Sequence, residues 1–378
     1  MKRAKTLAAC AAIVLLVPAL AGAQTLTRPP SGANQHSIVT QYIGLVSVTV
    51  DYNSPDVTGP SGQDRHGKIW GQLVPYGMPN LGYGTCTECP WRAGSNENTI
   101  FSVSHDVEIE GQPLAAGEYG LHMVPGEEEW TIIFSENSQA WGSFFYDPSE
   151  DALRVTVNSE ASEFHEWLTY EFVDRDPDQA TVALKWEDLA VPFTITVPKI
   201  TDYYIHQMRE ELEGAAGFVW QNLNNAAQYA IQNEHKDEAL VWATRAVNDP
   251  FSGNSNFSTL ISLSQAQEMN EQTTEAAASR ERAFEHPTTT AIQIHSWGRG
   301  MIAQGKATEA LNAYKISEKR FGEAWPVNVS MMRGYSAIGE YGTALGYAKK
   351  ALAQAPDDQN RQNLENLIKQ LEKGEDVN

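Results

Sequence analysis

The sequence predicts an α+β protein with segregated parts: an antiparallel β-sandwich or barrel comes first, and an α-solenoid of helical repeats follows. Three observations predict this fold class. Apolar and polar residues alternate between Ser37 and Val197, the apolar period becomes that of an amphipathic helix after Lys199, and small residues then recur at a nearly constant spacing. With 42% apolar residues and ten tryptophans, the 378-residue chain can build two cores.

The first 23 residues are typical of a signal peptide. Three of the first five residues are basic, Ala8–Leu20 is almost wholly apolar, and small residues end the segment at Ala23. We expect cleavage near Ala23 and an exported chain, periplasmic or extracellular, that begins near Gln24. Lipid attachment at Cys10 is the alternative, which is not favoured because the apolar core follows this cysteine instead of preceding it.

The charge of the chain narrows the classes of partner. The formal net charge is −21 at pH 7, and it falls to −24 once a signal with three basic and no acidic residues is removed. Binding to nucleic acid or to an anionic membrane surface depends on basic patches, so we expect neither. No stretch after the signal approaches the roughly 20 apolar residues of a membrane span.

Residues 24–199 have the pattern of strands with one face on a core. Val46, Val48 and Val50 share one face of a predicted strand, while Ser47 and Thr49 share the other. The same alternation recurs at 101–109, 153–157, 168–172, 182–186 and 193–197, with turn residues at 111–113, 125–126 and 174–178. Short strands without helices between them predict an antiparallel sandwich or barrel.

Residues 200–378 carry an internal repeat, and we place the boundary at 198–201. Ala239, Ala276, Ala310 and Ala344 are spaced by 37, 34 and 34 residues, close to the tetratricopeptide period. Prolines follow the second helix of three units, glycines precede it in two, and 364–371 is predicted as a capping helix. The sequence therefore predicts an α-solenoid of tetratricopeptide-like repeats, which would bind a protein or peptide partner.

The motifs of the β region are specific enough to suggest a family. A Leu-Val-Pro-Tyr-Gly stretch ends at Gly77, a Trp-Arg-Ala-Gly-Ser-Asn-Glu motif covers 91–97, and further motifs follow at 114–121, 125–131, 165–169 and 191–193. Residues 35–198 resemble the secreted bacterial family called domain of unknown function 2911. This sequence departs from the family's pattern in two places: Ser95 replaces the usual Ala, and residues 78–90 form an insertion before the motif. The resemblance implies an exported β domain and no reaction, because the family's activity is unassigned.

Cys86 and Cys89 lie in that insertion and are the cysteines left after signal removal. Their spacing fits a local disulfide, a metal site or thiol–disulfide exchange. The disulfide is favoured, because no strand–helix context of a redox motif surrounds them and one pair cannot supply four zinc ligands.

Six residues near these motifs are the candidate ligand-binding residues. Arg, Asn and Glu side chains on a loop held by a sheet could hydrogen-bond a sugar, peptide or carboxylate. The structural alternative is an Arg92–Glu97 ion pair, with Asn96 satisfying the backbone of the turn. The candidates are Tyr76, Trp91, Arg92, Asn96, Glu97 and His122.

A two-histidine, one-carboxylate metal site formed by His105, His122 and Glu97 is a further, weaker alternative. His105 is in register with Val103 and Val107, which favours a position on the apolar face. Phosphate-binding, dinucleotide-binding and serine-nucleophile motifs are absent from the sequence. We therefore expect no cofactor and no metal.

Two functions remain. The preferred one is an exported, non-catalytic binding or scaffold protein, in which the helical repeats bind a protein or peptide and the β domain anchors the chain or binds a small ligand. The alternative is a cell-envelope hydrolase acting on glycan or peptide, with a site around Tyr76–Glu97 and His122.

Overall fold

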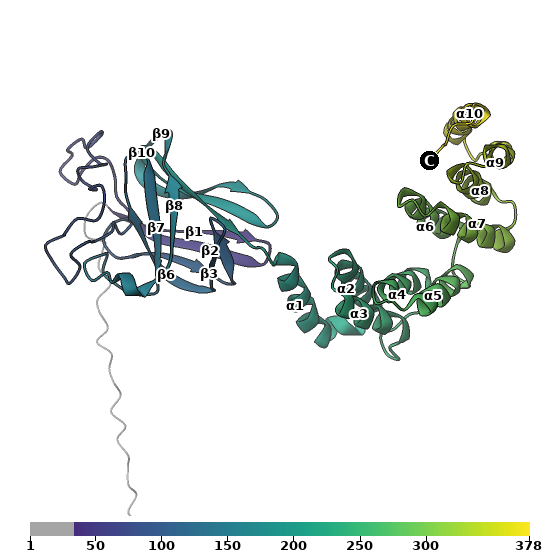
Figure 1. Ribbon diagram of the computed structural model, residues 1–378, viewed down its shortest axis with the longest axis horizontal. Coiled ribbons are helices and arrows are strands. Elements are labelled where there is room, and N and C mark those ends of the chain that lie inside the picture. The colour runs from purple at the N-terminus through teal and green to yellow at the C-terminus, as the bar shows by residue number, and fades with distance from the viewer. Residues whose placement is uncertain (1–33) are drawn as a thin grey trace, which may run out of the picture. The chain divides into compact units, whose positions relative to one another are not determined.

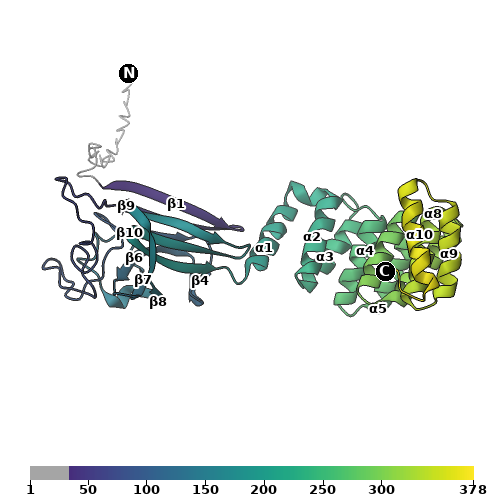
Figure 2. The same ribbon diagram turned by 90° about the horizontal axis from the view of Figure 1, so that it is seen from above.

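The computed structural model of the chain describes residues 34–378 (Figures 1 and 2). The expected signal peptide, its cleavage point and Cys10 lie outside these residues. The described chain divides into two compact units between Pro198 and Lys199. We call residues 34–198 the β unit and residues 199–378 the helical unit, and describe each by itself.

The larger sheet of the β unit has six antiparallel strands in the order β1-β2-β3-β6-β7-β8. Val46, Val48 and Val50 are fully buried, whereas the alternate residues of the same strand are only partly buried. This alternation is the predicted period of two, and it places one face of the sheet on the core. The strands are β1 (Gln35–Ile43), β2 (Val46–Ser54), β3 (Thr99–Val103), β6 (Gly117–Val124), β7 (Glu129–Ser135) and β8 (Asp151–Asn158).

The second sheet has four antiparallel strands in the order β5-β4-β10-β9. Its apolar face joins the same core: the ring of Phe193 on β10 lies 6.0 Å from that of Phe101 on β3 and 6.1 Å from that of Phe134 on β7, centroid to centroid. The strands are β4 (Val107–Ile109), β5 (Gln112–Leu114), β9 (Glu160–Arg175) and β10 (Gln179–Thr196).

The β unit corrects three details of the prediction. Neither sheet closes on itself, so the predicted sandwich is confirmed and the alternative, a barrel, is wrong. The runs 182–186 and 193–197 belong to one long strand, β10, which continues through a bulge at Glu187, where φ is +57°. The run 101–109 is broken at 104–106, so β3 and β4 enter different sheets, and Gln112 and Pro113 belong to β5 instead of a turn.

The helical unit has ten α-helices, and the pairs α2–α3, α4–α5, α6–α7 and α8–α9 follow one another along a curved stack (Figure 1). This arrangement confirms the predicted solenoid. The helices are α1 (Ile200–Glu213), α2 (Trp220–Gln232), α3 (Lys236–Asn248), α4 (Phe257–Met269), α5 (Thr273–Glu285), α6 (Ala291–Ala303), α7 (Ala307–Phe321), α8 (Trp325–Ala337), α9 (Tyr341–Ala353) and α10 (Asp358–Glu372).

Small residues and caps set the repeat. All four alanines chosen as equivalent positions are fully buried on the second helix of their pair. Asn256 and Thr290 begin α4 and α6 with reciprocal capping boxes. Gly305 and Gly339 take φ values of +76° and +82° in the turn between paired helices, a conformation that suits glycine. Between residues 34 and 378, no helix has the length and apolar character of a membrane span.

Candidate functional site

A cavity of about 380 Å³ lies in the β unit, where the connection between β2 and β3, residues 55–98, meets the segment after β7. In Figures 1 and 2 these connecting segments gather at one end of the sheets. The volume lies within the usual range of small-molecule sites. The polar and aromatic groups that line it are Asn34, Asp56, Arg65, Trp91, Arg92, Ser95, Asn96, Ser143 and Trp186, and prolines and aliphatic residues make up most of the remaining wall.

The backbone of Trp91 fixes one wall of the cavity. Its N–H donates to Met123 O at 2.7 Å and its carbonyl accepts from Met123 N at 2.8 Å, so the loop pairs with β6 as a one-residue bridge. Left-handed backbone follows at Ala93 and Asn96, where φ is +51° and +60°. The motif is therefore a tight, sheet-anchored turn that turns Arg92 toward the cavity.

The guanidinium of Arg92 is held without being neutralised. Its Cζ lies 5.1 Å from the centroid of the Phe144 ring, and its Nη1 donates to Asn96 O at 2.6 Å. Gly142 completes the cradle, because a Cβ built there would lie 2.7 Å from Arg92 Cζ. Burial lowers the pKa of Arg92, and no carboxylate of residues 34–378 lies within ion-pair distance of it.

The Arg92–Glu97 ion pair considered from the sequence does not form. Glu97 is exposed and accepts a hydrogen bond from Asn53 Nδ2 at 2.9 Å. Asn96 contributes its carbonyl to Arg92, and its side chain accepts from Asn34 Nδ2 at 3.1 Å. The cavity lining therefore holds two guanidiniums, Arg92 and Arg65, against one carboxylate, Asp56.

Four tryptophans form an aromatic cluster behind the cavity. The ring of Trp70 meets those of Trp91, Trp130 and Trp186 edge to face, at 5.7, 5.2 and 5.6 Å between centroids. Trp91 and Trp186 also line the cavity and lie nearly parallel, 15° apart. Sequence reasoning selected Trp91 alone, because the other rings come from elements that only the fold brings together.

His122 is buried behind the cavity wall and contacts one of the lining residues, Ser143. It is 2% exposed, its Nδ1 lies 2.9 Å from Ser143 Oγ, and its ring meets Tyr146 at 5.4 Å. Burial, and after it the charge of Arg92, lower the pKa of His122 to about 4. The imidazole is therefore neutral at pH 7. Ser143, its partner, lines the cavity, whereas His122 does not.

The remaining predicted residues lie elsewhere. Tyr76 is 43% exposed and packs against Gly71 outside the cavity lining. His105 lies in the bend between the two sheets, beside Ser104. Because Thr99 pairs with Leu121 and Val103 with Gly117, His105 and His122 lie toward opposite ends of β3 and β6. The weaker metal alternative is thus not assembled, and residues 34–378 contain no group of three ligands suited to a metal.

Cys86 and Cys89 form the expected disulfide. The disulfide packs with Met78, Ile133 and Tyr146, so the insertion covers the outer face of β7.

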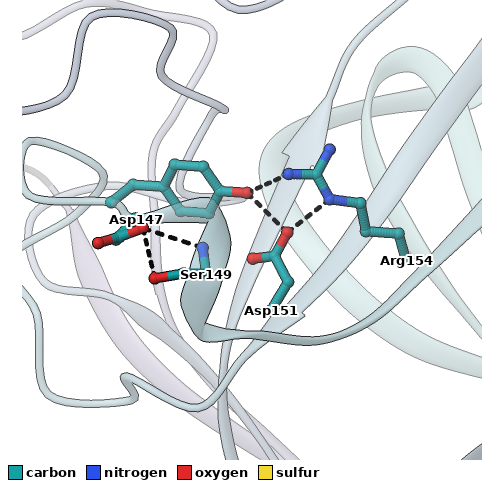
Figure 3. Close-up of polar contacts among 5 residues, drawn as sticks. Asp147, Ser149, Asp151 and Arg154 are labelled. Atoms are coloured by element: carbon teal, nitrogen blue, oxygen red, sulfur yellow. Dashed lines mark hydrogen bonds and ion pairs between the residues drawn. The ribbon is translucent and has the colours of Figure 1, made fainter.

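A polar network lies next to this disulfide: Tyr146 Oη donates to Asp151 Oδ2 at 2.8 Å and accepts from Arg154 at 2.6 Å. Figure 3 shows Asp151 and Arg154 side by side in this network. Asp147 accepts from the backbone and hydroxyl of Ser149 beside it. Because every charged group drawn has a partner, we assign the network a structural role: it holds the segment that carries Ser143.

Residues 34–195 match the model of the family described as protein of unknown function (DUF2911), which confirms the resemblance drawn from the motifs. No curated protein matches the chain. Several solved structures are similar to the helical region. One is MamA, which is 17% identical to this chain; the match covers 41% of this chain and 88% of MamA, with a TM-score of 0.28. Another is YrrB, described as a TPR protein with an unusual peptide-binding site. It is 17% identical; the match covers 44% of this chain and 84% of YrrB, with a TM-score of 0.27. A third is a thermophilic TPR protein of Thermus thermophilus. It is 16% identical; the match covers 46% of this chain and 91% of the Thermus protein, with a TM-score of 0.28.

Proposed function

We propose that this chain is an exported, non-catalytic binding protein. In this proposal the β unit binds a small ligand with a carboxylate or similar anionic group, and the helical unit binds a protein or peptide. The observation that carries the proposal is the guanidinium of Arg92, which lines an aromatic cavity and has no described carboxylate partner.

The chemistry of the cavity supports an anion with an apolar body. A partly buried guanidinium has lost hydration, so an entering carboxylate restores charge-assisted hydrogen bonds that water no longer supplies. Asn96 and Ser95 add polar groups for orientation, while Trp91 and Trp186 offer ring surface to the rest of the ligand.

The hydrolase alternative has one specific observation in its favour, the contact between Ser143 Oγ and His122 Nδ1. Two properties weaken it. Ser143 is 1% exposed, and an imidazole whose pKa is about 4 is a weak general base at neutral pH. Hydrolysis of a glycan or peptide substrate that Ser143→Ala abolishes without unfolding the chain would reverse this ranking.

Export is supported by the disulfide, because such bonds persist in oxidising compartments. The partner of the helical unit is proposed to be a protein or peptide, since stacked helix pairs form extended surfaces that suit such ligands.

Benzoate is the probe for the β unit, because it joins a carboxylate to a ring. We expect it to change the tryptophan fluorescence of the full chain, and we expect Arg92→Gln to weaken its binding at least about tenfold, as for loss of a charged hydrogen bond. Arg175→Gln is the matched control, because Arg175 is exposed near the β9–β10 turn. Equal benzoate affinity in Arg92→Gln and wild type would refute the assignment of the cavity.

A further inference from the structure

Residues 374–378, which follow α10, fold back onto α8. Val377 is 6% exposed and packs in the cluster that contains Met332 and Leu371. Its N–H donates to Ser336 Oγ at 3.0 Å and its carbonyl accepts from Arg333 Nη1 at 2.7 Å. The segment is thus held by main-chain hydrogen bonds and one apolar side chain, as a bound peptide would be.

The residues next to Val377 add further contacts. Ser336 Oγ donates to Asp376 Oδ1 at 2.6 Å, and Asn378 Nδ2 donates to Arg333 O at 3.1 Å. In Figure 1 this end of the chain lies on the side of the stack where α6 and α8 run. An acidic residue followed by an aliphatic residue is therefore the pattern that this part of α8 accommodates.

Two arginines of this face retain unused hydrogen-bonding capacity. Arg299 on α6 and Arg333 on α8 are separated by 34 residues, one repeat period, and so occupy equivalent positions. Arg299 is exposed, with no carboxylate of residues 34–378 at ion-pair distance. Arg333 Nε is buried, and no hydrogen-bond acceptor in the described chain reaches it. Burial, and after it the charge of Arg299, lower the pKa of Arg333, while Tyr314 and Asp376 act in the opposite direction.

We infer that the face of α6 and α8 carrying Arg299, Arg333 and Ser336 is a binding site for an acidic peptide, and that residues 374–378 occupy part of it. The external ligand is a segment with an Asp-aliphatic pair and a further carboxylate for Arg299. This inference rests on the proposed peptide-binding role of the helical unit and specifies the chemistry of the partner.

An external peptide has a reason to displace the internal segment. A segment tethered a few residues from its site has an effective concentration of about millimolar, so it lowers the apparent affinity of a competing ligand. The external peptide regains affinity through Arg299, which the internal segment leaves without an ion pair. Residues 374–378 therefore act as an internal competitor that only a more acidic ligand displaces.

The test uses the full chain and a fluorescein-labelled peptide of residues 374–378, Gly-Glu-Asp-Val-Asn. The double variant Asp376→Lys, Val377→Ser removes the acidic and apolar contacts of the internal segment. We expect this variant to bind the peptide at least about tenfold more tightly than wild type, because the site is no longer occupied. Adding Arg333→Ala should abolish that gain, whereas Arg361→Ala, an exposed arginine of α10, should leave it unchanged.

Binding no tighter than that of wild type, or a gain that survives Arg333→Ala, would overturn the inference. A second measurement needs no variant: a peptide with an added upstream Glu, in excess over wild-type chain, should increase amide hydrogen exchange at 374–378. Unchanged exchange at saturation would also overturn it. If a protein partner binds the helical unit with equal affinity in wild type and Arg333→Ala, the proposed function stands and this inference fails.

Discussion

Arg92 derives its position from two uncharged neighbours, the ring of Phe144 and the backbone of Gly142. Neither can neutralise the guanidinium, so its charge remains available to a ligand. The motif alone identifies Arg92 and Asn96 as loop residues. It cannot identify Gly142 or Ser143, because these approach from a segment that follows β7, about 50 residues later in the sequence.

Gly142→Ala tests the cradle. The new Cβ would lie 2.7 Å from Arg92 Cζ, so the guanidinium has to move and benzoate affinity should fall several-fold. The left-handed φ of +59° adds a cost of roughly 1–2 kcal/mol to the folded state. Gly62→Ala is the matched control: its φ is +76° and no atom lies within 4 Å of the new Cβ. Titration of both variants should show lost affinity in the first alone, and equal losses would contradict the cradle.

His122 predicts a pH dependence of stability. Its pKa is lowered to about 4 in the folded chain, below the ordinary value near 6.5, so the unfolded chain binds more protons between these values. The contribution of neutral His122 is complete above about pH 6.5 and is lost as the pH falls toward 4, by up to about 3 kcal/mol.

Urea unfolding followed from pH 7 to pH 4 checks this dependence. His122→Gln should remove part of the slope, because the replacement does not titrate between these pH values. A slope that is the same in wild type and His122→Gln would show that the histidine is not held neutral.

At the scale of elements, the period of two identifies the strands better than it identifies their ends. Both β3 and β4 continue one alternating run, but the bend at 104–106 sends them to different sheets. Conversely, the alternation predicts two separate strands at 182–186 and 193–197, whereas the structure has one strand, β10, with a bulge at Glu187. Bends and bulges depend on how a strand must turn to follow its partners, which local alternation does not record.

The helical pairs allow a sharper test, because α6 carries two glycines in different surroundings. A Cβ at Gly298 would lie 2.3 Å from the ring of Tyr314 on α7, so Gly298→Ala should lower the free energy of unfolding by about 1–3 kcal/mol. At Gly300 no atom lies within 4 Å, and Gly300→Ala should raise it by up to about 1 kcal/mol through helix propensity. Thermal melts check the pair, and changes of the same sign would contradict the close packing of α6 on α7.

At the scale of the whole molecule, composition and periodicity suffice to predict two units of different class, because each signal persists over more than a hundred residues. The cavity could not be predicted in the same way, since its lining joins residues from position 34 to position 186. Only three of the six predicted ligand residues, Trp91, Arg92 and Asn96, line it.

The division at Pro198 predicts that each unit folds alone. Residues 24–198 and 199–378 should each show a cooperative thermal transition when produced separately, because each has its own core. A non-cooperative melt of either piece would place the boundary elsewhere.

Because we expect export with cleavage of the signal peptide, the protein isolated from its native host should have the mass of a product that begins near Gln24. A mass that includes the N-terminal segment would contradict the predicted cleavage.

Calorimetric titration of the full chain with benzoate and with benzamide tests the central claim most directly, because the two molecules have nearly the same shape and differ in charge. If the unneutralised guanidinium of Arg92 selects the ligand, benzoate should bind at least about tenfold more tightly than benzamide, and the difference should disappear in Arg92→Gln. Equal affinities for the two molecules in wild type, or no detectable binding of either, would contradict an anion-binding cavity in the β unit.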